Sequence, residues 1–148
     1  MGIEMDVTQL SENELTELSA WVSLHKKLRK FIATGTVVRV DHPDPGYDVH
    51  GLVSEDREYA IFCITRISTS AQRPSPNLHL PYLDLGTEYE IRELLPEGVV
   101  TEIVDGRDSV PWWNEGLRLS GSTLSKCGIR FPDLKPMQSV LLEVKADC

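Results

Sequence analysis

The chain has 148 residues, of which 41% are hydrophobic and 26% charged, and its formal net charge is −8 at pH 7. A chain of this length is expected to form one core, or a core with an appendage. Its acidic balance argues against nucleic acid and anionic membranes as partners. No run of about 20 apolar residues predicts a membrane-spanning helix, and residues 1–6 lack the basic and apolar parts of a signal peptide.

The first predicted element is one long amphipathic helix that begins after Ser11 and ends at Gly35. Ser11 and Glu14 have the spacing of a capping box, and Gly35 is a natural C-terminal cap. The apolar face of this helix is so broad that it is typical of a helix covered from more than one side, and we therefore expect the helix to be part of a larger protein. Its apolar side carries Leu15, Leu18, Trp21, Val22, Leu24, Leu28, Phe31 and Ile32, with His25 among them.

From residue 36 the pattern changes to short strands separated by turns. The segment 59–68 is apolar on both faces, which predicts a central strand, and 88–92 alternates, which predicts a half-exposed one. About eight short strands at close spacing predict a mainly β fold, an antiparallel two-sheet β-sandwich of Greek-key type behind the one long helix. The predicted strands are 36–40, 49–54, 59–68, 78–80, 88–92, 99–104, 117–120 and 140–144, with 105–116 irregular and 124–128 a turn.

The cysteines indicate the compartment. Cys63, Cys127 and Cys148 form an odd and widely spaced set, which gives neither a disulfide framework nor a C-x-x-C metal pair. Cys63 lies in an apolar run and is expected to behave as a small core residue. A reducing, cytoplasmic location fits this pattern best.

Two groups of residues could bind a ligand. Trp112 and Trp113, together with Tyr82, could stack on sugars. The favoured alternative is that the tryptophan rings close the end of the sandwich or face a neighbouring domain. The run Asp41-His42-Pro43-Asp44 could hold a metal or act in acid–base chemistry, but an Asx-turn with an exposed histidine before proline is favoured.

No segment has the signature of an active site. A serine-centred nucleophile elbow, a P-loop and a dinucleotide-binding loop are all missing from the sequence. Most carboxylates lie at the helix start, on exposed strand positions or in turns, which argues against the paired carboxylates of a glycosidase. We therefore expect no catalytic residue, no metal ligand and no cofactor in this chain.

Several segments together, through their order and spacing, resemble the C-terminal part of bacterial α-galactosidases of glycoside hydrolase family 36. Residues 2–6, 10–15 and 24–29 resemble the end of that family's catalytic barrel and its last helix. Residues 38–43, 50–53, 80–84 and 121–128 resemble its C-terminal β-domain, and 138–144 its closing strand. The resemblance covers the chain nearly end to end.

The resemblance implies a parent enzyme with an N-terminal β-domain, a (β/α)8 barrel that carries both catalytic carboxylates, and a C-terminal β-domain. It assigns residues 1–35 to the trailing end of the barrel and 36–148 to the C-terminal β-sandwich. The chain is then a non-catalytic accessory domain of a retaining α-galactosidase. Its partner would be the missing barrel. Without the barrel, we expect the apolar face of the helix to drive a dimer through residues 10–35, or the helix to fold back on its own sheet. The alternative is a carbohydrate-binding β-sandwich module.

Overall fold

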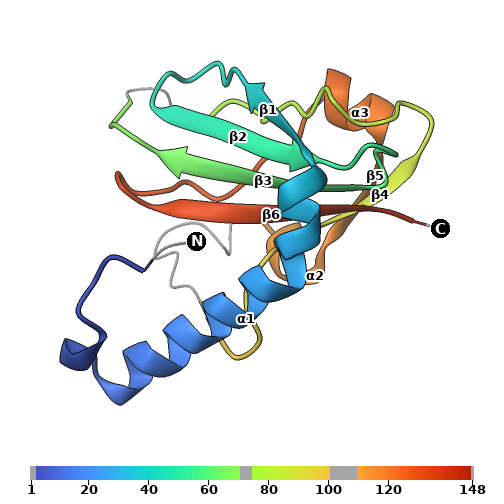
Figure 1. The fold of residues 1–148 in the computed structure, drawn as a ribbon. Helices are drawn as coiled ribbons and strands as arrows, with labels where there is room; N and C mark the ends of the chain where they lie inside the picture. Colours follow the sequence, from blue (N-terminus) through green and yellow to red (C-terminus); the bar gives the residue numbers. More distant parts are fainter. Residues whose placement is uncertain (1–2, 71–74, 101–109, 148) are drawn as a thin grey trace. The chain divides into compact units, whose positions relative to one another are not determined.

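The computed structural model describes residues 3–70, 75–100 and 110–147 (Figure 1). The described part of the chain divides into two compact units. The first consists of residues 3–34 and the short segment 95–100, and the second of residues 35–70, 75–94 and 110–147. Each unit is described by itself below.

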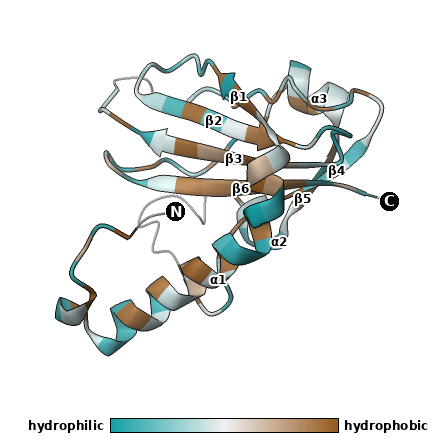
Figure 2. Cartoon of the chain, in the orientation of Figure 1, coloured by the Kyte–Doolittle hydropathy of each residue, from teal (hydrophilic) through white to brown (hydrophobic). Residues whose placement is uncertain are grey.

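The first unit is built around one long helix. A short 3-10 turn, η1 (Val7–Gln9), precedes α1 (Glu12–Thr34). The predicted capping box is confirmed, because the Ser11 N–H donates to Glu14 Oε2 at 2.8 Å and the Glu14 N–H donates to Ser11 Oγ at 3.4 Å. The Ser11 hydroxyl also donates to Glu14 Oε2, at 2.7 Å, and this bond together with the one from the Ser11 N–H holds the pKa of Glu14 below its usual value. Apolar and polar residues alternate along α1 (Figure 2), and none of its residues is buried.

The second unit contains a six-stranded antiparallel sheet in the order β1-β2-β3-β6-β4-β5 (Figure 1). The predicted central strand is confirmed, because β3 is hydrogen-bonded to β2 on one side and to β6 on the other. The last strand in chain order, β6, is inserted between β3 and β4. The strands are β1 (Thr36–Val40), β2 (Tyr47–Val53), β3 (Tyr59–Arg66), β4 (Glu88–Glu93), β5 (Leu117–Ser120) and β6 (Ser139–Ala146).

The prediction of a mainly β, antiparallel domain behind one long helix is confirmed. All named strands in the described ranges lie in a single sheet, and a layer without regular strands packs on one of its faces. The predicted strand 78–80 forms only one isolated bridge, between Leu78 and Ile129. It does not continue as a strand, because Leu80 donates its N–H to Leu124 O, in the helix α3 (Gly121–Lys126), and not to a neighbouring strand. The predicted strand 99–104 lies largely outside the described residues.

Two short helices occupy stretches predicted to be irregular. The turn prediction at 124–128 is wrong, because α3 (Gly121–Lys126) begins directly after β5, with the Ser120 hydroxyl accepting from the Thr123 N–H. Within the segment 105–116, the described residues include α2 (Trp112–Glu115), which ends at Gly116. Gly116 has φ of 85°, a conformation that favours glycine.

The core lies on one face of the sheet. Strand β3 shows why, since its even-numbered residues are buried and its odd-numbered residues are half-buried, as the two-residue period of a strand requires. The second layer supplies Leu78, Leu80, Leu83, Leu124, Ile129 and Phe131 to the same cluster. The strands supply Val38, Val49, Phe62, Ile64, Tyr89, Ile91, Leu142 and Val144. No helix in the described part of the chain combines the length and the apolar character that a bilayer-spanning helix needs.

Candidate functional surface and the buried arginine

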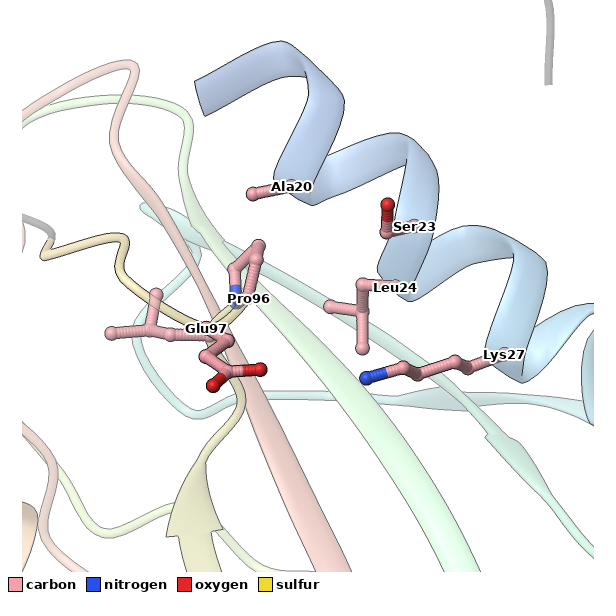
Figure 3. Close-up of a pocket in the computed structure, with 7 residues that line it drawn as sticks. Ala20, Ser23, Leu24, Lys27, Pro96 and Glu97 are labelled. Carbon is pink, nitrogen blue, oxygen red and sulfur yellow. The ribbon is translucent and has the colours of Figure 1, made fainter. Parts of the chain in front are cut away.

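One side of α1 faces a short irregular segment of the first unit. Ala20, Leu24 and Lys27 extend from the helix toward Pro96 and Glu97 (Figure 3). The cavity between them has a volume of about 440 Å³. A second cavity of about 300 Å³ also includes Ala20 and Glu97 in its lining. The segment 95–100 therefore covers this side of α1 only loosely.

The opposite side of α1 carries most of the predicted apolar face, whereas Leu24 lies on the side toward Pro96 and Glu97. A helix turns by about 100° per residue, so Leu18, Val22 and His25 lie on the side away from Ala20 and Lys27. At the two ends of this face, Leu15 is 42% exposed and Ile32 is 40% exposed. An amphipathic helix normally buries such a stripe. This apolar face of α1 is therefore the first candidate functional surface.

The predicted sugar-stacking residues are placed in different parts of the second unit. Trp113 is only 3% exposed, and its indole N–H donates to Glu93 Oε2 at 2.9 Å. Trp112 is half-buried, and its indole N–H donates to Arg130 O at 2.9 Å. The two rings contact each other, with centroids 5.2 Å apart, and Trp113 belongs to the core cluster. A buried ring of this kind offers no face to a sugar.

Tyr82 lies away from the tryptophans. Its ring is 41% exposed, and its hydroxyl donates to the backbone carbonyl of Arg39 in β1 at 2.9 Å. Trp113 is anchored to β4, which is four strands away from β1 in the order of the sheet. The structure therefore does not bring Tyr82 and the two tryptophans together into one platform.

The turn 41–46 contains no metal site. The prediction that His42 is exposed is wrong, because the residue is half-buried. Its Nε2 lies 3.1 Å from Pro76 O, and its ring packs edge-on against Tyr47 and Phe131. The Asx-turn occurs at Asp44, whose Oδ1 accepts from the Gly46 N–H at 2.8 Å. Among the described residues, no group of three or more histidines, cysteines or carboxylates could hold a metal ion.

The sequence interpretation missed a buried ion pair beside this turn. Asp44 is completely buried, and its Oδ2 lies 3.3 Å from Nη1 of Arg66, whose side chain is 7% exposed. The Arg66 guanidinium also stacks over the Tyr47 ring at 4.4 Å. A signal for this pair exists in the sequence, because Arg66 follows Ala60, Phe62 and Ile64 at two-residue steps. The period of a strand directs all four side chains to the core face.

Two tyrosines, the half-buried Tyr59 and the buried Tyr89, have raised pKa values. Burial, and then the hydrogen bond to Glu143 and its charge, raise the pKa of Tyr59, whose hydroxyl donates to Glu143 Oε1 at 2.6 Å. Burial also raises the pKa of Tyr89, whose hydroxyl donates to Arg57 O at 2.8 Å. A tyrosine is neutral at physiological pH even without such a shift, so both phenols serve as structural hydrogen-bond donors between segments far apart in the chain.

Comparison with known proteins gives the evolutionary context. The family described as the glycosyl hydrolase family 36 C-terminal domain matches residues 47–144, about two thirds of the chain. An alpha-galactosidase of Escherichia coli is 31% identical over 152 aligned residues, which cover 98% of this chain and 21% of that protein. Alpha-galactosidase AgaA of Geobacillus stearothermophilus is 33% identical over 94 residues, covering 63% of this chain and 13% of that protein.

The solved structures lead to the same family. A variant of Geobacillus stearothermophilus AgaA in complex with raffinose superposes with a TM-score of 0.71 at 25% identity. The match covers 96% of this chain and 17% of that one. The chain thus spans about a fifth or less of the length of the relatives it matches. By sequence and by fold, the chain belongs to the family of glycosyl hydrolase family 36 C-terminal domains.

Proposed function

We propose that this chain is a non-catalytic accessory domain of an α-galactosidase-like glycoside hydrolase. Its role is structural: it packs on the catalytic barrel and supports assembly of the enzyme. Residues 1–35 form the trailing end of the barrel, and residues 36–148 form the C-terminal β-domain. The observation that carries the proposal is α1, a helix of 23 residues that has a broad apolar face and no buried residue. Such a face is stabilised when a partner covers it.

The chemistry belongs to the barrel in this proposal. A retaining glycosidase needs two carboxyl groups about 5–5.5 Å apart, one as nucleophile and one as acid and base. We assign neither role to a residue of this chain. The relatives are named alpha-galactosidases, and one of them was solved with raffinose, which supports terminal α-galactosides as substrates of the parent enzyme. The free thiol of Cys63 supports a reducing, cytoplasmic location.

The test uses the enzyme at its native length, as found by immunoblot of the source cells with an antibody to this chain. Val22→Asp places a charge in the centre of the apolar face of α1, where burial against a barrel would be costly. Ser19→Asp, at an exposed position of the same helix, is the matched control. We expect Val22→Asp to reduce assembled, active enzyme and Ser19→Asp to leave it unchanged. Equal behaviour of the two variants would reject the packing role.

The chain on its own provides a second test. It should not hydrolyse a chromogenic α-galactoside. Without a barrel, the apolar face of α1 should be covered by a second copy, so we expect a dimer in light scattering that Val22→Asp converts to monomers. A monomeric wild-type chain, or turnover of the substrate, would contradict this reading of the face.

A carbohydrate-binding surface is the second candidate function, and one observation favours it. Tyr82 presents an aromatic ring that is 41% exposed, and such rings stack on the apolar faces of sugars. Trp112, which is half-buried, is the weaker contributor. Calorimetric titration with galactose and raffinose decides between the candidates. Heat that saturates at millimolar sugar and disappears in Tyr82→Ala would support binding, and no heat would remove this function.

A further inference from the structure

The charged residues of α1 are separated by sign along the helix. Three exposed glutamates lie in its first half, and four exposed basic residues lie in its second half. These residues are Glu12, Glu14 and Glu17, and Lys26, Lys27, Arg29 and Lys30. Within the described ranges, none of the four basic side chains forms an ion pair with its own chain. The basic half of α1 therefore has charge to offer to a partner.

The helix macrodipole does not account for the basic half. Its effect fades within the last turn of a helix, and the last turn of α1 contains no basic residue. Lys30, the basic residue closest to the end, lies a full turn before Thr34. At the other end, Glu14 accepts both bonds from Ser11 at Oε2, and an ionised carboxylate has room for further donors on its second oxygen. Both signs of charge can thus pair across an interface.

The apolar face of α1 fits a copy of itself that runs in the opposite direction. When two identical helices pack antiparallel about a two-fold axis, residues equally far from the axis in opposite directions face each other. With the axis between Trp21 and Val22, Leu18 of one copy lies opposite His25 of the other. A helix turns by about 100° per residue, which places these four side chains within a sector of about 100° on one side of α1. The face is therefore complementary to itself.

The same axis sets charges of opposite sign against each other. Glu14 of one copy lies opposite Arg29 of the other, and Glu12 lies opposite the stretch around Lys30. In a parallel pair each residue would face its own copy, so that Glu14 would meet Glu14 and Arg29 would meet Arg29. Like charges placed against each other are unfavourable. The order of charges along α1 therefore selects the antiparallel pair over the parallel one.

We propose that the 148-residue chain forms a dimer in which α1 packs antiparallel on α1 of a second copy, with the two-fold axis between Trp21 and Val22. This inference rests on the proposed function, which makes the apolar face of α1 a contact surface. It adds the partner, the direction and the register of the contact in a chain without a barrel. The opposite side of α1, with Ala20 and Lys27, stays outside the contact.

Disulfide cross-linking measures the direction of the two helices. In a chain whose native cysteines are replaced by serine, Leu18→Cys and His25→Cys are made as separate variants, one with a size tag. In the proposed pair the substituted positions of the two variants face each other, whereas two copies of one variant keep theirs about 10 Å apart along the helix axis, too far for a disulfide. We expect cross-links only in the mixture. Cross-links within one variant alone would show a parallel pair, and an absence of cross-links in the mixture would also overturn the proposal.

Two charge variants test the register with the native cysteines in place. Arg29→Glu turns both Glu14–Arg29 contacts of the dimer from attraction to repulsion, and should raise its dissociation constant about tenfold or more in analytical ultracentrifugation. Lys27→Glu changes the net charge equally on the side toward Pro96 and Glu97, and should leave the constant unchanged. Equal constants in the two variants would overturn the register. A failure of the proposed function would appear elsewhere, in the Val22→Asp variant of the enzyme at its native length.

Discussion

Removal of the carboxylate charge from the buried ion pair should destabilise the second unit severely. In Asp44→Asn the side chain keeps its size, and the amide oxygen can still accept from the Gly46 N–H. Arg66 loses the carboxylate that compensates its charge, and its side chain is 7% exposed, so water cannot replace it. The loss of one partner of a buried pair typically costs about 3–5 kcal/mol, because the other charge is left uncompensated.

The same sheet supplies a matched control. Arg39 and Asp48 form a pair of nearly the same length, 3.5 Å against 3.3 Å, but their side chains are 78% and 34% exposed. Exposed pairs contribute about 0.2–1 kcal/mol, so Asp48→Asn should cost less than about 1 kcal/mol. For a domain of roughly 100 residues, each kcal/mol lowers Tm by about 4 °C. Asp44→Asn should therefore lower Tm by about 12–20 °C and Asp48→Asn by about 4 °C at most.

Thermal unfolding followed by near-ultraviolet circular dichroism measures both shifts in the same sheet. If the two variants lose similar stability, burial does not set the strength of the Asp44–Arg66 pair, and the reasoning fails. A double variant, Asp44→Asn with Arg66→Met, tests the mechanism further. It removes the uncompensated charge and should recover part of the loss, since well-packed apolar replacements of buried ion pairs are often neutral. A further loss in the double variant would contradict this explanation.

Two further predictions concern packing and pH. A Cβ on Gly121 would lie 2.0 Å from Asp84 O, while a Cβ on Gly86 would have only Asp84 Oδ1 near it, at 3.9 Å. Gly121→Ala should therefore lower the free energy of unfolding by about 1–3 kcal/mol or more, and Gly86→Ala by no more than about 0.5 kcal/mol. Urea unfolding of the two variants measures both losses. The raised pKa of Tyr59, caused by burial and by Glu143, means that the unfolded chain ionises first, near pH 10. The stability that Tyr59 contributes is fully present below that pH and is lost as pH rises toward the pKa of the folded state. Between about pH 9 and about pH 11, Tyr59→Phe should therefore lose less free energy of unfolding than the wild type does. An equal loss in both proteins would show that Tyr59 does not cause this pH dependence.

The sequence predicts the elements whose signals lie in neighbouring residues. The capping box of Ser11 and Glu14 is such a signal, and α1 begins directly after Ser11. The helix ends at Thr34, directly before the predicted cap Gly35. Strands β1 and β5 coincide with the predicted segments, because β-branched and alternating residues favour extended backbone over a few positions. The insertion of β6 between β3 and β4 could not be predicted in this way, since it depends on contacts between residues far apart in the chain.

The functional residues were harder to predict for a similar reason. For Trp112 and Trp113 the sequence left sugar stacking open beside the favoured packing role, and it could not name their contacts: hydrogen bonds to Arg130 and Glu93 hold the two indoles. His42 was expected in solvent, and long-range contacts with Pro76 and with aromatic rings enclose it. Composition and spacing reveal which side chains are present, but only the fold reveals which of them share a site.

The position of β6 has a consequence for synthesis of the protein. A ribosome releases the chain in order, so β1, β2 and β3 emerge first and β4 and β5 follow. The strand that joins these two groups is made after both of them. Until then, β3 and β4 each present an unpaired edge, which invites pairing with other chains. Pairings between distant segments also form slowly. A chain that stalls before residue 139 would keep both edges open, and cellular quality control could recognise it by them.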